Sequence, residues 1–182
     1  MTTGERRAAI LGGLMVIVIL LMLGIAVIAF GLFNVAADAP DSGLTKLVVG
    51  MARERAIDAR ADDIKVPPLS SSQMIVEGAG HYDAMCTGCH LAPGMKDNEM
   101  RPGLNPKPPA LAMLPSEEPA EQFWVVKHGI KMTAMPAWGL THSDQEIWNI
   151  VAFLQKLPKL SPQEYQALVQ EAGDHRHQPS AN

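Results

Sequence analysis

Cysteine is scarce in this chain, because only Cys86 and Cys89 occur among 182 residues. A tetrahedral zinc site needs four ligands, and one cysteine pair followed by one histidine leaves that set incomplete. A thioredoxin-like redox pair needs a βαβ setting, and the sequence has no convincing strand pattern around the two cysteines. A disulfide across two intervening residues would be strained. These absences disfavour a zinc site, a dithiol enzyme and a structural disulfide.

An excess of basic charge is also missing. The chain has 15 Lys and Arg against 19 Asp and Glu, a formal net charge of −4. Two of the basic residues and one acidic residue precede residue 34, so the remainder carries −5. This balance excludes nucleic acid as a partner, and a mildly acidic surface would suit a basic protein partner.

The two cysteines form part of the sequence Cys86-Thr87-Gly88-Cys89-His90. The spacing C-x-x-C-H is typical of covalent c-type haem attachment. Two thiols one helical turn apart can each form a thioether with one vinyl group of the porphyrin, and the adjacent imidazole can bind the iron. Gly88 leaves room for the porphyrin edge. The motif predicts one covalent haem c held by Cys86, Cys89 and His90.

One long apolar run extends over residues 10–33, which contain no charged residue. At about 1.5 Å per residue, a helix of this length spans the roughly 30 Å hydrocarbon core of a bilayer. Arg6 and Arg7 precede the run, so the positive-inside rule keeps residues 1–9 in the cytoplasm. We predict a single-pass anchor in a bacterial inner membrane with the haem domain on the periplasmic side. The alternative is a secretory signal cleaved near Ala37, which would give a soluble periplasmic protein.

The rest of the chain divides into a linker, a haem domain and a C-terminal part. Residues 34–72 read as a linker containing an amphipathic helix at 43–62. That helix could lie on the membrane, contact a partner subunit or, as we favour, pack on its own domain. Residues 73–160 form the predicted haem domain, and residues 161–182 a last helix and a disordered tail.

The haem domain should be built from helices alone. Hydrophobic periodicity and caps predict helices over 72–85, 119–128, 143–157 and 161–172. Capping boxes of Ser143 with Glu146 and of Ser161 with Glu164 begin the last two of these helices. Between the first two, residues 91–118 are rich in proline and glycine. A loop of that length is unusual in a compact domain, but a bound macrocycle would supply the apolar core that it wraps. We find no internal repeat.

The ligand on the other face of the iron determines what the haem can do. Met135 is the favoured candidate, because Pro136 holds an extended backbone before it and because it lies 45 residues after His90, enough chain to reach the opposite face of the haem. Met132 is its nearest rival. His81 lies too close to His90 to reach the opposite face, and His128 sits at a helix end. The remaining candidates are Met95, Met100, Met113, His142, His175 and His177, of which the last two form an HxH pair in the tail.

Together, CTGCH, a proline-rich loop, MPAW and the helix SDQEIWNIVAFLQKLP resemble class I cytochromes c over residues 73–158. The resemblance implies a small all-α cytochrome c domain wrapped around one haem, with His90 and Met135 as axial ligands. It also implies that a carbonyl of the proline-rich loop accepts a hydrogen bond from His90, and Pro109 is the first choice and Pro102 the second. The helix before Cys86 should cross the helix at 143–157, with Gly80 or Ala79 against Trp148, Val151 or Phe153.

The anchor makes the layout similar to membrane-anchored monohaem cytochromes. We therefore predict a one-electron carrier, not itself an enzyme, that serves membrane-bound donors and acceptors such as a quinol-oxidising complex, a terminal oxidase or another oxidoreductase. The alternative is a cytochrome c subunit of a larger membrane oxidoreductase or terminal oxidase complex. A haem-based sensor or a peroxidase-like enzyme would require an open or displaceable sixth position and is disfavoured by Met135.

Overall fold

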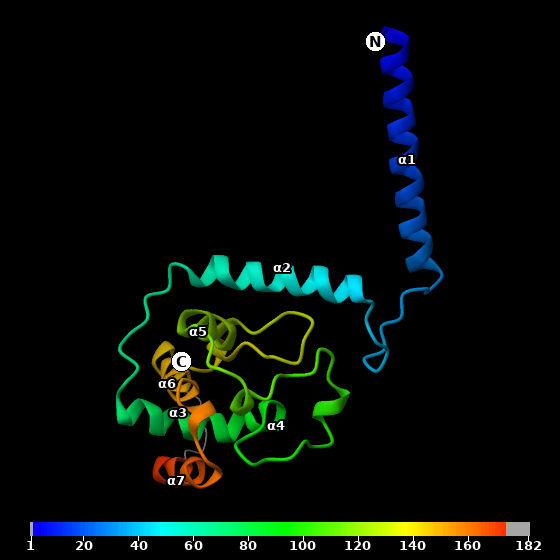
Figure 1. The fold of residues 1–182 in the computed structure, drawn as a ribbon. Helices are drawn as coiled ribbons and strands as arrows, with labels where there is room; N and C mark the ends of the chain where they lie inside the picture. Colours follow the sequence, from blue (N-terminus) through cyan, green and yellow to red (C-terminus); the bar gives the residue numbers. More distant parts are fainter. Residues whose placement is uncertain (1, 174–182) are drawn as a thin grey trace. The chain divides into compact units, whose positions relative to one another are not determined.

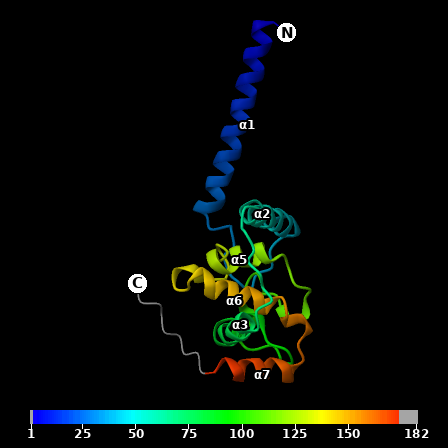
Figure 2. The ribbon, with the colours of Figure 1, turned by 90° about the vertical axis from the view of Figure 1, so that its left-hand side faces the viewer.

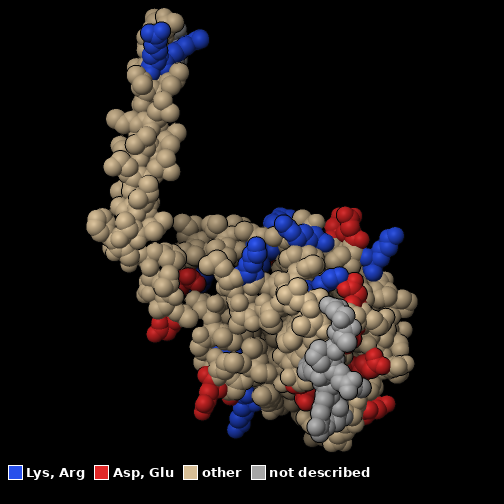
Figure 3. Space-filling model, turned by 180° about the vertical axis from the view of Figure 1, so that it is seen from behind, with Lys and Arg blue, Asp and Glu red and all other residues tan. Residues whose placement is uncertain are grey.

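The computed structural model describes residues 2–173 and divides into two compact units, Met1–Ala39 and Pro40–Asn182. The first unit contains helix α1 (Thr3–Ala29), whose N-terminus is capped by reciprocal hydrogen bonds between Thr2 and Glu5. Its most apolar 18-residue window has a mean hydropathy of 3.0. Figure 3 shows basic side chains at the N-terminal end of α1 and uncharged ones along its length. A helix of this kind near the N-terminus is a membrane anchor or a signal sequence.

The second unit is a stack of helices. α2 (Gly43–Ala61) contacts α5 (Pro119–His128), α5 contacts α6 (Asp144–Leu154), α6 crosses α3 (Ser72–Met85), and α3 contacts α7 (Pro162–Ala172). Figures 1 and 2 show the same order from two directions. Among residues 2–173 the regular structure is entirely helical, as the sequence predicts. The short helix α4 (Thr87–His90) directly follows α3.

The core lies between α3, α5, α6 and α7. It consists of aliphatic and aromatic side chains that the sequence places on one face of each helix, with Tyr82, Ile147, Val151, Phe153 and Tyr165 essentially inaccessible. The rings of Tyr82 and Phe153 lie 5.3 Å apart, and those of Phe123 and Trp148 are stacked at 4.1 Å. Burial of such large apolar side chains is the main force that holds the unit together.

The crossing of α3 and α6 depends on Gly78. A β-carbon at this position would overlap the backbone oxygen of Asn149 and lie 2.8 Å from the β-carbon of Phe153. The structure thus confirms Phe153 at the crossing but puts the close contact one residue before Ala79 and two before Gly80, which the sequence had suggested. Beside this contact the Asn149 amide donates to the Glu77 carboxylate at 2.5 Å.

Helix α7 is joined to α3 on the opposite side. The buried Tyr165 hydroxyl donates to Asp83 Oδ1 at 2.7 Å, and burial followed by this hydrogen bond raises the pKa of Tyr165 above its ordinary value. The Tyr165 hydroxyl therefore remains protonated and a donor. Because Asp83 lies in the last turn of α3, this bond connects the C-terminal helix to the segment just before Cys86.

Helix α2 packs on its own domain through α5, as predicted, but most of its apolar side chains are not covered by that contact. Ala61 is buried, whereas Leu44, Leu47, Val48 and Met51 are each more than half exposed. The C-terminal half of α2 is the covered part, because Ala56 and Ile57 are half-buried and Ala61 is buried.

Helix starts agree with the predictions better than helix ends. α6 and α7 both begin with the predicted capping boxes, Ser143 with Glu146 and Ser161 with Glu164. The prediction that α6 reaches Leu157 was wrong by three residues, since a turn of 3₁₀-helix, η4 (Leu157–Lys159), carries Pro158 instead. A proline disfavours α-helical backbone at the residue before it.

Candidate functional site

The CTGCH motif lies at the carboxyl end of α3. The backbone nitrogen of Cys86 still donates to α3, and α4 begins at the next residue. The Thr87 hydroxyl donates to the carbonyl oxygen of Asp83 at 2.8 Å, so the second residue of the motif is bound to the last turn of α3. Because α3 is fixed by its crossing with α6, the core determines where the motif lies.

Tyr82 holds the other end of the motif from within the core. Its hydroxyl donates to the carbonyl oxygen of Leu91 at 2.6 Å, and Leu91 has a φ of 61°. Burial, followed by the neighbouring Cys86, raises the pKa of Tyr82 above its ordinary value. The hydroxyl therefore stays protonated and able to donate, which stabilises the turn that ends α4.

The two cysteines do not have the properties of a dithiol enzyme. Such enzymes use a thiol whose pKa is lowered, so that it is a thiolate at neutral pH. Burial, followed by the nearby Cys89, raises the pKa of Cys86 to about 12. Both cysteines are free of disulfide bonds. A buried Cys86 thiol that stays protonated, with a second cysteine and a histidine beside it, fits covalent attachment of a group better than thiol–disulfide exchange.

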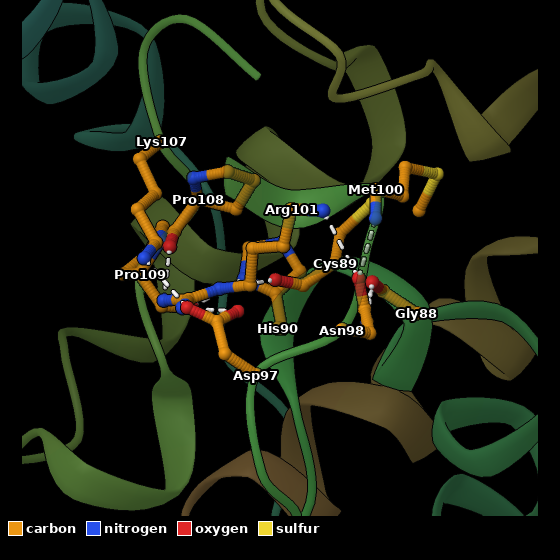
Figure 4. A network of polar contacts seen from close by, with 10 residues as sticks. All are labelled: Gly88, Cys89, His90, Asp97, Asn98, Met100, Arg101, Lys107, Pro108 and Pro109. Carbon is orange, nitrogen blue, oxygen red and sulfur yellow. Dashed lines mark hydrogen bonds and ion pairs between the residues drawn. The ribbon is translucent and has the colours of Figure 1, made fainter. Parts of the chain in front are cut away.

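His90 presents one ring nitrogen for coordination. Its Nδ1 lies 2.9 Å from the carbonyl oxygen of Pro109 (Figure 4). A carbonyl oxygen can only accept, so Nδ1 carries the proton and Nε2 of the neutral ring keeps its lone pair. Burial lowers the pKa of His90, against the opposing effect of this hydrogen bond. The ring is thus held neutral and oriented, the form in which a histidine binds a metal. The partner is Pro109, whereas Pro102 lies in η1 (Arg101–Gly103).

Two side chains from the following loop cap the motif. The last carbonyl groups of a helix lack partners within that helix. Asn98 Nδ2 donates to the Gly88 oxygen at 2.7 Å, and Arg101 Nε donates to the Cys89 oxygen at 3.0 Å (Figure 4). The sequence reasoning missed both residues. Their only signal was that both side chains can donate hydrogen bonds, a property that Lys96, Asn105 and Lys107 of the same loop share.

Met132 and Met135 lie in different environments, although only two residues separate them. Met135 is half-buried and packs against the core, whereas Met132 is 98% exposed. Thr133 fixes the turn between them, since its hydroxyl donates to the Ile130 oxygen at 2.7 Å and accepts from the Met135 nitrogen at 3.1 Å. Gly129, with a φ of 64°, lies so close to this segment that a β-carbon would be 2.7 Å from the Met135 oxygen. The turn directs Met135 inward and Met132 outward.

The other candidate ligands are placed elsewhere. Met100 and Met113 are more than half exposed, Met95 is 39% exposed, and His128 is exposed with its ring against Trp124. The rings of His81 and His142 lie 5.7 Å apart, and that of His142 also contacts Trp138. His175 and His177 lie outside the described residues. Within residues 2–173, no three His, Cys, Asp or Glu side chains are grouped as a further metal site would require.

Comparison with known proteins identifies the domain. Residues 73–154 match the family described as cytochrome C oxidase, cbb3-type, subunit III. None of the curated proteins and none of the solved structures matches the chain. The matched segment contains α3 to α6 with the CTGCH motif and Met135. It is a c-type cytochrome domain, and such a domain carries covalently bound haem c. The thiol pair and the oriented, neutral imidazole fit that group.

Proposed function

We propose that this protein is a membrane-tethered one-electron carrier, not itself an enzyme, with one haem c bound by Cys86, Cys89 and His90 and with Met135 as second axial ligand. The observation that carries the proposal is the arrangement of His90 at the end of CTGCH, with Nδ1 bonded to Pro109 and Nε2 available. When bound, the haem supplies an iron that cycles between its ferrous and ferric states.

The chain's own residues orient the two ligands and shield them. Pro109 fixes the imidazole plane, and such an outer contact also increases the electron donation of the ring. Thr133 and Gly129 define the turn that directs Met135 inward. Two protein ligands leave no open position for a substrate, and a thioether ligand favours the ferrous form over bis-histidine ligation. These features support electron transfer over catalysis or gas sensing.

The assignment of Met135 can be tested with the matched pair Met135→Ala and Met132→Ala in the full-length protein. Bonding of a methionine sulfur to ferric haem iron gives a weak absorption band at the red end of the spectrum. We expect Met135→Ala to lose this band and Met132→Ala to keep it, because Met132 is almost fully exposed. The reverse result would show that Met132 is the ligand. A wild-type protein that lacks the band and binds carbon monoxide readily would refute the carrier proposal.

The sidedness of the membrane is a further part of the proposal. Arg6 and Arg7 before the apolar helix support a cytoplasmic N-terminus and a haem domain on the periplasmic side of a bacterial inner membrane. Protease added to intact spheroplasts should remove the haem-stained domain. Amino-terminal sequencing of the mature protein would distinguish a retained anchor from a signal cleaved near Ala37.

A second candidate is supported by the family match. The matched family is described as a subunit of a cytochrome oxidase, so this chain could serve as the cytochrome subunit of a membrane oxidoreductase that passes electrons onward. Gentle detergent extraction followed by sizing of the haem-stained band distinguishes the two. A band near the mass of the chain, 19.6 kDa plus detergent, supports the free carrier, and a much larger one supports the subunit.

A further inference from the structure

We propose that Arg101 is the positioning residue of the proximal side, which keeps the Pro109 carbonyl in hydrogen-bonding position at His90. This inference rests on the proposed function, in which His90 binds the haem iron. It adds that the electron donation of His90, and with it the reduction potential of the haem, depends on an arginine. Arg101 donates to the residues that precede His90 and Pro109, not to His90 itself.

The guanidinium group of Arg101 connects the two backbone segments that carry the His90–Pro109 pair. Its Nε donates to the oxygen of Cys89 at 3.0 Å, and its Nη2 donates to the oxygen of Pro108 at 2.7 Å (Figure 4). Each of these residues immediately precedes one member of the pair. A single planar group therefore fixes the spacing between the backbone before His90 and the backbone before Pro109.

The chemistry of this loop explains why a side chain is needed for the task. Pro108 and Pro109 have no backbone N–H, so this stretch cannot be held by donors of its own. It can be held only through its carbonyl groups. Arginine provides several donors in one rigid plane, whereas lysine provides a single rotating ammonium group on a flexible stem. Arg101 is only 7% exposed, and its position is therefore well defined.

The buried charge of Arg101 is balanced from the solvent side. Its Nη1 pairs with Asp97 at 3.1 Å, and Lys107 pairs with the other carboxylate oxygen of Asp97 at 2.7 Å. Such pairing is what makes burial of a cation tolerable. Asp97 thus holds the guanidinium in place, while Lys107 contacts the group only through Asp97.

If the Arg101 contacts are lost, the Pro109 carbonyl is held less firmly, and the hydrogen bond that it accepts from His90 Nδ1 should weaken. A weaker bond makes the imidazole a poorer electron donor, which destabilises ferric relative to ferrous iron. Removing a positive charge would act in the opposite direction. Arg101→Lys is therefore the informative variant, since it keeps the positive charge and removes the planar group whose donors bind both carbonyls.

The experiment measures two properties of the full-length haem-loaded protein. In the ferrous, diamagnetic state, NMR follows exchange of the His90 Nδ1 proton with deuterium, and redox titration gives the midpoint potential. In Arg101→Lys we expect this proton to exchange roughly ten- to a hundred-fold faster, which corresponds to loss of about one charge-assisted hydrogen bond. The midpoint potential should become more positive.

Two controls isolate the contacts of Arg101. Arg53→Lys makes the same change on the exposed surface of α2, where Arg53 pairs only with Glu54 among the ion pairs of the described chain. Lys107→Gln removes a positive charge near the site without touching either carbonyl. In both control variants the His90 Nδ1 proton should exchange at the wild-type rate. Asp97→Asn keeps Arg101 but removes the charge of its ion-pair partner, so exchange of the His90 Nδ1 proton should be accelerated less than in Arg101→Lys. This second variant tests the inference if Arg101→Lys does not accumulate.

The outcomes separate this inference from the proposed function. Wild-type exchange and potential in Arg101→Lys, or no acceleration in Asp97→Asn, would overturn the positioning role while leaving the haem ligands unaffected. Equal acceleration of the core amides of α3 and the His90 proton would show general loosening and would also overturn it. A wild-type protein in which His90 does not bind the iron would refute the proposed function itself.

Discussion

Replacing Gly78 with alanine tests the contact on which the position of the CTGCH motif depends. The added methyl group would overlap the Asn149 backbone oxygen and come within 2.8 Å of the Phe153 β-carbon. Neither obstacle is the end of a flexible side chain, so α3 and α6 must separate. Their separation would loosen the packing of the two helices throughout the core.

The expected magnitude follows from two opposing effects. Overpacking a core typically costs about 1–3 kcal/mol, and the rigid obstacles at Gly78 point to the upper end of that range. Alanine in place of glycine within a helix gains about 0.5–1 kcal/mol. We therefore expect Gly78→Ala to lower the free energy of unfolding by about 2 kcal/mol.

The matched control is Gly50→Ala in α2. Apart from the backbone of its own helix turn, nothing lies within 4 Å of a β-carbon placed at Gly50. Only the helix-forming advantage therefore remains, and the variant should be more stable by about 0.5–1 kcal/mol. Guanidinium chloride unfolding of the haem-loaded proteins, followed by far-ultraviolet circular dichroism, measures both changes. A Gly78→Ala variant as stable as Gly50→Ala would refute the argument that the helix crossing requires glycine.

Three further predictions concern the site. Gly129→Ala should weaken the methionine–iron absorption band, because a β-carbon there displaces the Met135 backbone, while Gly173→Ala, with a φ of 72° and open space around it, should leave the band intact. Tyr82→Phe should cost about 1–3 kcal/mol of unfolding free energy, since a buried carbonyl loses its donor. The pKa of Asp97 is lowered by hydrogen bonds from its two basic partners, so its stabilising effect is complete above the unfolded pKa of about 3.9 and is lost as pH falls through the lower folded value. Denaturation midpoints at about pH 6 and pH 3 should therefore differ less in Asp97→Asn than in wild type.

Local signals in the sequence were sufficient for the helices but not for their contacts. Serine and glutamate three residues apart predict the starts of α6 and α7, because a capping box depends only on residues that are close in the sequence. The glycine at the crossing was misplaced by one or two residues, since Gly78 and Gly80 both lie in α3 and only the packed structure shows which of the turns meets α6.

The loop after the motif was the least predictable part. Residues 91–118 have no hydrophobic period, so sequence patterns could not show that Asn98 and Arg101 return to cap the CTGCH carbonyl groups. Those contacts arise from the path of an irregular chain. The CTGCH spacing, in contrast, is a local chemical requirement, and it predicted haem c from five residues.

The contacts that hold α3 also have a consequence for the order of events during biosynthesis. Asn149 is 72 residues beyond Glu77, and Tyr165 is 82 residues beyond Asp83. A chain made from its N-terminus therefore presents Cys86 and Cys89 long before the residues that lock the helix beside them exist, and contacts so distant in sequence form slowly. Haem attachment can take place on a motif that is still held only by local bonds, and α6 and α7 then fix the helix that precedes it.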